Sequence, residues 1–410
     1  MRLVHEVAPV HRGLPPLGVW SAIVGSRVLA LVAGYLSVTH LSQAVYAGRL
    51  TYDPTALLSG APGRWLNAWA DWDGQWYIRI ARLGYRGHDY AAFFPLYPML
   101  LRVLSPLAAH SYIVAGVALS LVCYIAAMVV LYRLVTIDYG DRVASWTVVF
   151  MSVFPTSFFF QAVYTESIFL LTTVTCLYFA RRERWLLAGL AGFLAALARN
   201  TGILVLLPMA LFYLEARGWR PRRLDRRLAW FGLVPAGLAV WMAYLLGRFG
   251  DPLAFSHAQG HWHRYLAAPW TAVDLGVRQG IVGIEALLRN GEGTPSISSH
   301  NTLLIPVTLP NALAFASLVG AAAVLILSAR RLRLPYAVYG WASLAAPLFY
   351  PTLRQPLFSL PRFLLVIFPV FLGLALVTER LKVTRVAIVA AFVLGLLLLT
   401  SVFVRFHFVA

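Results

Sequence analysis

Charged residues are scarce in this sequence. Only 12% of its 410 residues are Asp, Glu, Lys or Arg, and 60% are hydrophobic, whereas soluble globular domains are about 25% charged. Water cannot solvate a chain of this composition. The apolar runs 113–131, 312–327 and 386–404 approach or reach the roughly 20 residues that cross a hydrocarbon core. The sequence therefore predicts an all-α polytopic membrane protein.

Cysteine, lysine and acidic residues are also few. Cys123 and Cys176, the two cysteines, lie inside apolar runs, so neither a disulfide framework nor a metal quartet is predicted. Lys382 is the only lysine, and the net charge is +18. The basic residues form short clusters between apolar runs, which argues against nucleic-acid binding.

Nucleotide-binding motifs are missing as well. The sequence contains neither a phosphate-binding loop nor a dinucleotide fingerprint, which argues against direct use of ATP or a soluble NAD cofactor. No cofactor is predicted, and dependence on a divalent cation is left open.

The placement of arginine predicts the topology. Arg2 and Arg12 precede an apolar stretch without a cleavage pattern, so we expect an uncleaved first helix. With the N-terminus in the cytoplasm, the basic clusters at 181–184, 217–227, 330–333 and 380–385 all fall inside and the C-terminus falls outside. About eleven spans result: 17–39, 110–132, 143–160, 166–180, 185–198, 201–216, 229–248, 302–329, 334–351, 362–378 and 386–404.

This topology treats residues 1–410 as one integral membrane domain with two long outer segments, 40–109 and 249–301. The apolar stretch 93–107 must not span, because it is short, contains Arg102 and three prolines, and would reverse every later cluster. We expect it to lie in the outer interface or to re-enter. Function is expected in the outer segments.

The first outer segment is aromatic. Trp65, Trp69, Trp72 and Trp76 recur at spacings that share one helical face. Since indole prefers the headgroup level, we expect a helix lying along the outer leaflet.

Two carboxylates, Asp71 and Asp73, interrupt this aromatic segment. If the helix continues through both, they point about 200° apart, so they do not form a dyad. Either is a solvated or capping carboxylate, or a base that accepts the proton of an attacking hydroxyl. Arg79, with Arg82 and Arg86, binds either a phosphate or anionic headgroups.

Other polar residues sit at predicted helix ends on the same outer side. Glu166 opens one helix, where an acid is favourable in any case, and Arg199 with Asn200 ends another. Charges at this depth are expensive when they face lipid, which favours a cavity. Arg362 begins a helix, so its charge calls for an anionic partner, unless its side chain snorkels to headgroups.

Histidines are grouped in the second outer segment. His257, His261 and His263 have ligand-like spacing, but no nearby cysteine completes a site. We interpret them as surface or acceptor-contacting residues and predict no metal site. The stretch 290–296 is predicted to be a flexible loop.

A longer pattern in the first half resembles a known family. The sequence WDGQWYIRIARLGY at 72–85, followed by AFFPLYP at 92–98, FPTS at 154–157, AVYTES at 162–167 and ARNTG at 198–202, resembles the PIG-V-like mannosyltransferases of the GT-C class. The resemblance covers about 65 to 205, with PRF at 361–363 as a further match.

The resemblance implies a GT-C fold and interfacial helices in the first outer loop. It also implies inverting transfer of a sugar, mannose in this family, from a polyprenyl-phosphate donor to an acceptor hydroxyl of a glycan, glycolipid or protein. Asp73 is the implied base and Asp71 the second choice. Donor or acceptor contacts are expected from a further set of residues, namely Gln75, Tyr77, Arg79, Tyr97, Glu166, Arg199, Asn200 and Arg362.

Two other functions compete with this one. A transporter or flippase of lipid-linked sugars would use the same residues for binding alone, but the sequence shows no internal repeat and its charges lie at the outer rim. A non-catalytic subunit of a glycosylation complex would tolerate loss of Asp73. The short, arginine-rich chain suggests a prokaryotic plasma membrane with an extracytoplasmic active site.

Overall fold

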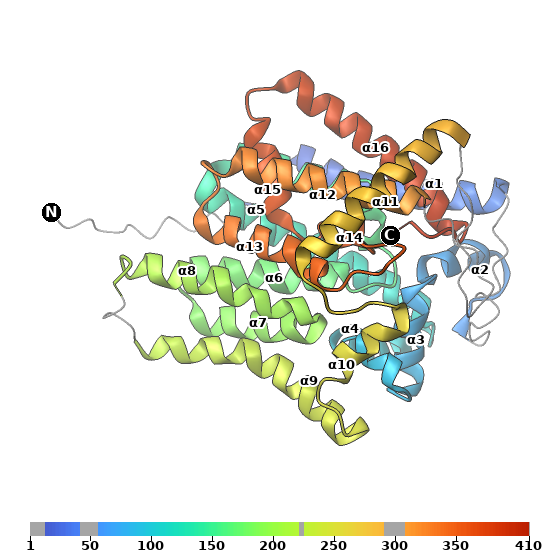
Figure 1. Ribbon diagram of the computed structural model, residues 1–410, viewed down its shortest axis with the longest axis horizontal. Helices are drawn as coiled ribbons and strands as arrows, with labels where there is room; N and C mark the ends of the chain where they lie inside the picture. The colour runs from blue at the N-terminus through green and yellow to red at the C-terminus, as the bar shows by residue number, and fades with distance from the viewer. Residues whose placement is uncertain (1–12, 42–55, 221–224, 291–307, 410) are drawn as a thin grey trace.

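A computed structural model describes residues 13–41, 56–220, 225–290 and 308–409. These residues form helices and no strand, and the longer helices lie side by side in a bundle (Figure 1). The α-helices are α1 Leu17–His40, α2 Gly60–Leu66, α3 Asp73–Leu83, α4 Leu96–Leu104, α5 Tyr112–Val153, α6 Glu166–Arg181, α7 Trp185–Ala198, α8 Leu206–Ala216, α9 Leu233–Phe249, α10 Ala254–His257, α11 Pro269–Asn290, α12 Thr308–Ser328, α13 Leu334–Ala345, α14 Leu360–Leu364, α15 Phe368–Val377 and α16 Lys382–Val404. The 3₁₀ helices are η3 Asn67–Ala70, η4 His88–Ala92, η5 Ser105–Ala108, η6 Ser157–Phe160, η7 Asn200–Val205, η9 Arg226–Gly232, η10 Ala258–Trp262 and η11 Ala346–Phe349.

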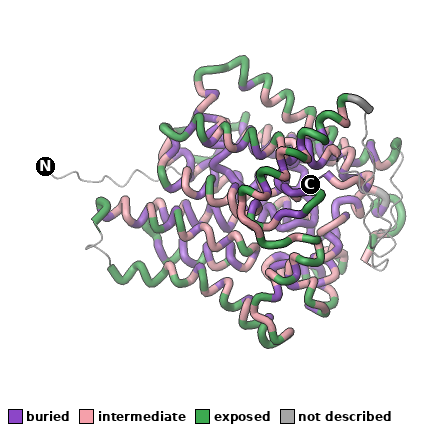
Figure 2. Tube along the Cα trace, viewed as in Figure 1, coloured by how far each residue is buried: buried purple, intermediate pink, exposed green. Residues whose placement is uncertain are grey.

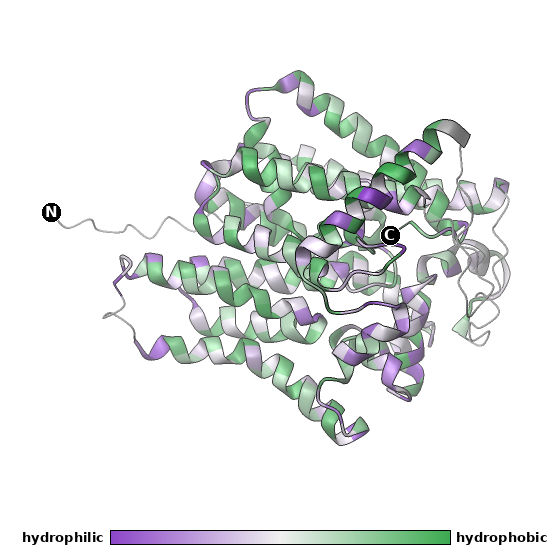
Figure 3. Ribbon diagram, in the orientation of Figure 1, coloured by the Kyte–Doolittle hydropathy of each residue, from purple (hydrophilic) through white to green (hydrophobic). Residues whose placement is uncertain are grey.

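The bundle has the surface of a membrane protein. Within the described ranges, five helical segments are long and apolar enough to cross a bilayer: α1, α5, η9 with α9, α12 and α16. Outward faces of the bundle are hydrophobic, as Figures 2 and 3 show together, and Val122 and Leu398 are 66% and 57% exposed. Such a surface is stable in lipid and not in water. The chain is an integral membrane protein.

Most predicted helices are present, but several boundaries are wrong. The two spans expected at 110–132 and 143–160 are present as two helical stretches of α5 that meet at Gly140, where the backbone leaves helical geometry (φ 78°, ψ 170°). Its helix ends at Val153, before Pro155, because the residue preceding a proline is disfavoured in helical conformation. The span expected at 362–378 is likewise broken into α14 and α15. Residues 302–307 and the loop predicted at 291–296 lie outside the described residues.

The continuous aromatic helix expected at 65–76 is wrong. The chain instead forms α2 and η3, leaves helical geometry at Trp72 (φ 59°, ψ −119°) and begins α3 at Asp73. Trp69 is fully buried. The four indoles therefore do not share a face at the leaflet surface, because spacing predicts a common face only while the backbone stays helical.

The outer segments contain short and amphipathic helices. Helix α4 lies within the stretch 93–107, has nine residues and is about 14 Å long. As expected, it is too short to span the membrane. It packs against α3 and α5. The second outer segment contains α11, a 22-residue amphipathic helix that the apolar-run criterion did not reveal. Helix α11 packs along α12.

A buried arginine fixes the irregular segment between α5 and α6. Arg27 of α1 is 4% exposed. Its Nη2 donates to the Ser152 carbonyl (2.9 Å) and the Ser157 hydroxyl (2.7 Å), its Nη1 donates to the Ser157 carbonyl, and its guanidinium lies 4.9 Å from the Tyr124 ring centroid. Buried carbonyls that leave helical pairing need another donor. Arg27 supplies it.

A network of ion pairs joins four helices at the end of the bundle where α5 breaks. Asp138 of α5, whose side chain is 2% exposed, accepts from Arg181 of α6 (2.9 Å), from Arg333 before α13 and from the Tyr336 hydroxyl (2.7 Å). Arg333 also donates to Glu215 of α8 (2.6 Å). These contacts fasten α5, α6, α8 and α13 together.

Replacing Arg27 by leucine tests the role of its hydrogen bonds to Ser152 and Ser157. Arg27→Leu removes the guanidinium donor from the buried Ser157 carbonyl and leaves the Ser152 carbonyl the Ser157 hydroxyl (2.8 Å) as its side-chain donor, at a cost of about 2 kcal/mol. We expect a lower Tm for the purified protein in detergent. Arg184→Leu, which changes an exposed arginine, is the matched control; equal Tm values for the two variants would contradict the assignment.

Candidate active site

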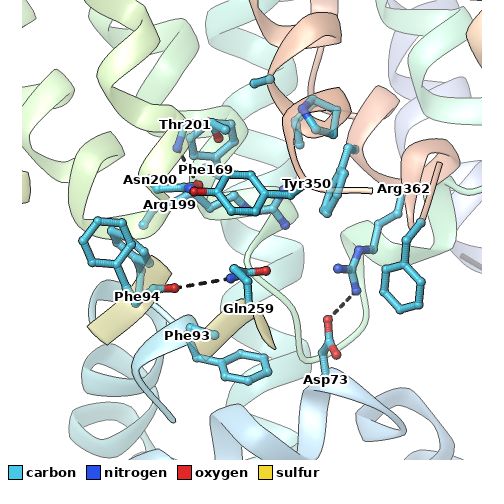
Figure 4. A pocket seen from close by; sticks show the side chains of 18 of the residues that line it. Asp73, Phe93, Phe94, Phe169, Arg199, Asn200, Thr201, Gln259, Tyr350 and Arg362 are labelled. Atoms are coloured by element: carbon cyan, nitrogen blue, oxygen red, sulfur yellow. Dashed lines mark hydrogen bonds and ion pairs between the residues drawn. The ribbon is translucent and has the colours of Figure 1, made fainter. Parts of the chain in front are cut away.

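A cavity of ≈ 220 Å³ opens between the two outer segments. Its walls come from the start of α3, the 92–94 link, the α7–η7 junction, the segment from α10 to Arg264, and the 346–367 region (Figure 4). The polar and charged side chains that line it are Asp73, Tyr77, Arg199, Asn200, Thr201, Ser256, Gln259, Arg264, Ser343, Tyr350 and Arg362.

Asp73 and Arg362 point toward one another in this cavity (Figure 4). Arg362 Nη1 donates to Asp73 Oδ2 at 2.6 Å. Asp73 is the first residue of α3 and its side chain is 29% exposed, whereas that of Arg362 is 10% exposed. An acid in the first turn also suits the helix dipole. The pair joins residues 289 positions apart.

Glu166 lies behind this pair, at the start of α6. Its side chain is fully buried, and its Oε1 accepts from Arg199 Nη2 and lies 3.3 Å from Arg362 Nε. Arg199 also donates from Nε to the Thr165 hydroxyl at 2.9 Å. A buried carboxylate requires such partners. Glu166 therefore holds two of the cavity's arginines in place.

Arg264 is the third arginine of the cavity, and its contacts with the described residues are weak. Its guanidinium lies 4.7 Å from the Phe358 ring centroid, and its polar contacts to Gln259 Oε1 and the Phe358 carbonyl are 3.5 Å long, beyond normal hydrogen-bond length. Burial and, to a smaller degree, the neighbouring charge of Arg362 lower the pKa of Arg264 to about 10, and Asp73 opposes the shift.

The described charges of the cavity do not balance. Arg199, Arg264 and Arg362 carry three positive charges, and Asp73 with Glu166 carries two negative ones, so the sum is +3 − 2 = +1. An uncompensated buried cation costs free energy. The arrangement favours an anionic ligand.

Aromatic side chains close the cavity on the α3 side. Tyr77, one turn after Asp73, packs edge-on against Phe93 (5.1 Å between centroids) and Tyr97 (5.3 Å). Trp262 meets Phe93 edge-on at 5.6 Å. Such walls exclude water and leave apolar contact area for a ligand.

Five of the residues predicted for the site do not line the cavity, and Glu166, which lies behind it, is one of them. Asp71 is 3% exposed, and its backbone carbonyl accepts from the Tyr164 hydroxyl at 2.9 Å. Gln75 donates to the Ala70 carbonyl, and Tyr97 donates to the Gly116 carbonyl, so both support the backbone around the site. Arg79 lies half-buried beside Trp76. The cavity does contain Asp73, Tyr77, Arg199, Asn200 and Arg362.

Sequence reasoning did not select four further residues that line the cavity: Gln259, Trp262, Arg264 and Tyr350. One feature of the sequence could have indicated Arg264: it is an arginine close to Trp262 and to the three histidines of the second outer segment. Its importance depends on burial against Phe358, 94 residues away, which no local pattern reveals.

The three histidines do not gather into a metal site. No cluster of three or more His, Cys, Asp or Glu ligands occurs among the described residues. His257 instead pairs with Asp251 (2.7 Å) and His261 with Asp89 (3.3 Å). The second pair links the two outer segments beside the cavity.

Removal of Arg199 should destabilise the site. Arg199→Gln takes one of two cationic partners from the buried Glu166, which costs about 3 kcal/mol, so we expect a clearly lower Tm in detergent. Asn200→Ala, at the neighbouring exposed position, should change the Tm little. A Tm loss of the same size in both variants would show that Glu166 does not depend on Arg199.

Comparison with known proteins finds a family match in the first half of the chain. The family model described as mannosyltransferase (PIG-V) matches residues 19–214, a range that contains Asp73, Glu166 and Arg199 but not Arg264 or Arg362. GPI mannosyltransferase 2 of Drosophila pseudoobscura pseudoobscura is 32% identical over 108 residues, which are 24% of each chain. The same enzyme of Drosophila melanogaster is 27% identical over 157 residues, 35% of each chain.

The matched segments thus span about a quarter to a third of these relatives. Both relatives are eukaryotic, so the prokaryotic membrane expected from the sequence stays a prediction.

Similarity of fold extends beyond the segment matched by sequence. The crystal structure of ArnT from Cupriavidus metallidurans bound to undecaprenyl phosphate superposes with a TM-score of 0.51 at 14% identity, covering 89% of this chain and 61% of ArnT. The expected polytopic GT-C fold is confirmed. Over residues 19–214 this chain is similar to the PIG-V mannosyltransferase family.

Proposed function

We propose that this protein is an inverting membrane glycosyltransferase that moves a sugar, mannose by its family relationship, from a polyprenyl-phosphate donor to a hydroxyl of a glycan, glycolipid or protein. The observation that carries the proposal is a partly exposed carboxylate, Asp73, in a cavity that has one positive charge in excess. A base and an anion site are the two groups that this reaction needs. The fold shared with ArnT bound to undecaprenyl phosphate supports such a donor.

In this reaction Asp73 accepts the proton of the acceptor hydroxyl. The hydroxyl oxygen forms a bond to the anomeric carbon as the bond between that carbon and the phosphate oxygen breaks, and the lipid phosphate leaves with the electron pair. One displacement inverts the anomeric centre. Phosphate is a good leaving group, so the reaction requires no protonating acid beside Asp73.

The donor phosphate would lie between Arg264 and Arg362. Both guanidinium groups line the cavity, and they are close enough for the charge of Arg362 to lower the pKa of Arg264. A phosphate between them would compensate the excess charge, and its charge-assisted hydrogen bonds would strengthen as the leaving group develops charge.

The same geometry gives Arg362 a second task. Its Nη1 binds Asp73 Oδ2 at 2.6 Å and so occupies one oxygen of the carboxylate. A donor phosphate would compete for the guanidinium and weaken that bond. The carboxylate oxygen would then be available to the acceptor hydroxyl.

The proposed orientation places the cavity on the extracytoplasmic side and the N-terminus in the cytoplasm. Its support is the distribution of arginine, since the clusters around Arg181 and Arg333 lie at the opposite end of the bundle, with the Asp138 network. Cytoplasmic loops carry such an excess of arginine. A prokaryotic plasma membrane is the proposed location.

Asp73→Asn tests the base. Transfer of radiolabelled mannose from polyprenyl-phosphate mannose in proteoliposomes should fall about 10²- to 10⁴-fold, because the amide cannot accept the proton. The folded fraction of the variant, checked by size-exclusion chromatography, should be retained. Asp71→Asn is the matched control, since Asp71 does not line the cavity, and we expect it to keep most activity.

Three results would change this assignment. Loss only in Asp71→Asn would move the base to Asp71. Equal activity of Asp73→Asn and wild type would exclude Asp73. A wild type that transfers no sugar from any lipid-phosphate donor but moves the lipid across the bilayer would be a flippase.

Arg264→Gln tests the phosphate site. We expect the KM for the donor to rise at least about tenfold, since the neutral amide loses a charge-assisted contact to phosphate. Arg264→Lys should retain part of the affinity, because an ammonium binds phosphate as a point charge. Arg278→Gln, an exposed arginine paired with Asp274 on α11, is the control. An unchanged donor KM in Arg264→Gln would exclude the site.

A further inference from the structure

The turn that precedes α3 has an unusual backbone. Gly74 N–H donates to the Asp71 carbonyl at 3.3 Å, and Trp72 between them has φ 59° and ψ −119°. These angles are those of the first central residue of a type II′ turn, a position that favours glycine. A tryptophan there is strained, so other contacts must hold it. Asp73, the proposed base, is the next residue.

Two phenylalanines that follow α16 hold this tryptophan. The Phe406 ring stacks on the Trp72 indole with centroids 4.6 Å apart and planes 9° apart, and Phe408 meets the indole edge-on at 5.4 Å. Phe406 is 2% exposed and itself has a positive φ of 67°. Stacked and edge-on aromatic pairs of this kind are stabilising beyond the area that they bury.

The contact continues to the opposite wall of the cavity. The ring centroids of Phe408 and Phe358 are 5.3 Å apart, and the Arg264 guanidinium lies over the Phe358 ring. Trp72, Phe406, Phe408 and Phe358 thus form a row, here called the aromatic clasp. One end of the clasp adjoins the residue before Asp73, and the other end adjoins the proposed phosphate site.

We propose that Phe406 is a positioning residue: by stacking on Trp72 it keeps the Asp71–Gly74 turn in its strained form and so keeps the Asp73 carboxylate in the cavity. The proposal rests on the proposed function. Without the stack, Trp72 relaxes to a negative φ, the turn reopens, and the start of α3 rotates Asp73 away from Arg362. Loss of the clasp affects the chemical step more than substrate binding.

Kinetics of Phe406→Ala test this. We expect kcat to fall about 10- to 100-fold, as for a misplaced catalytic group, while the KM for the donor stays within about twofold. Phe406→Tyr, which keeps the ring, should restore kcat. Phe392→Ala is the control: it removes a ring of α16, the helix that precedes Phe406. That ring packs against Phe150 and Phe154, away from α3, so the change should leave the kcat of folded protein unchanged.

A double-mutant cycle separates the turn from general packing. Glycine adopts positive φ without strain, so in the Trp72→Gly background Phe406→Ala should have little further effect on kcat. A wild-type kcat in Phe406→Ala, or a loss of equal size in both backgrounds, would overturn the proposal.

Hydrogen exchange provides a readout that does not depend on activity. In Phe406→Ala the amides of residues 72–77 should exchange at least about tenfold faster than in wild type, and Phe392→Ala should leave them unchanged. If wild type lacks transferase activity but this protection still depends on Phe406, the proposed function fails while the clasp stands. Unchanged exchange with active wild type and reduced kcat would show that Phe406 acts by another route.

Discussion

The position of Arg362 determines how the rest of the site is arranged. Its guanidinium contacts Asp73 of α3 through Nη1 at 2.6 Å and Glu166 of α6 through Nε at 3.3 Å. A cation with 10% of its side chain exposed is stable there only because both carboxylates are present. The same requirement ties the 360–364 region to two elements in the first half of the chain. Ion pairing thus joins Arg362 to one residue 289 positions earlier, Asp73, and to Glu166 almost 200 positions earlier.

The site is built where helices are interrupted. Asp73 follows a turn, Glu166 follows the irregular stretch 154–165, Arg199 separates α7 from η7, and Arg362 lies in the short α14. Irregular backbone at membrane depth is tolerated only when protein or a cavity surrounds it. Arg27 donates to the buried Ser157 carbonyl of one such stretch, and the Thr156 hydroxyl donates to the Pro361 carbonyl at 2.9 Å next to Arg362. The interruptions bring polar groups into the site, and internal hydrogen bonds offset the free-energy cost of backbone groups that leave helical pairing.

Much of this fold could be predicted from the sequence. Helices such as α6 and α7 are found within a residue or two of their predicted bounds, because apolar runs bounded by arginine determine both ends. The break at Trp72 could not be predicted, since spacing carries no information about a backbone strained by distant contacts. Amphipathic α11 escaped notice for a related reason: hydropathy averages its two faces.

The site was predictable to the extent that its residues sit in one continuous motif. Asp73 and Tyr77 are one helical turn apart, and sequence alone placed them together. The cost of a charge near a helix end indicated Arg199, Arg362 and Glu166 as site residues. Only the fold shows that both arginines contact Glu166. Arg264 was invisible because its burial is produced by Phe358, which is remote in sequence.

Two ion networks in the same protein show how structural charges differ from functional ones. At one end of the bundle, Asp138 and Glu215 oppose Arg181 and Arg333, two charges of each sign, joined by short contacts. In the cavity, two carboxylates oppose three arginines, and the excess cation Arg264 has polar contacts of 3.5 Å. A network whose purpose is to hold helices together reaches its lowest free energy when its charges cancel. The cavity does not reach that state with the described side chains alone, and an anion would complete it. Residue type alone would not distinguish the two clusters; the balance of charge and the length of the contacts do.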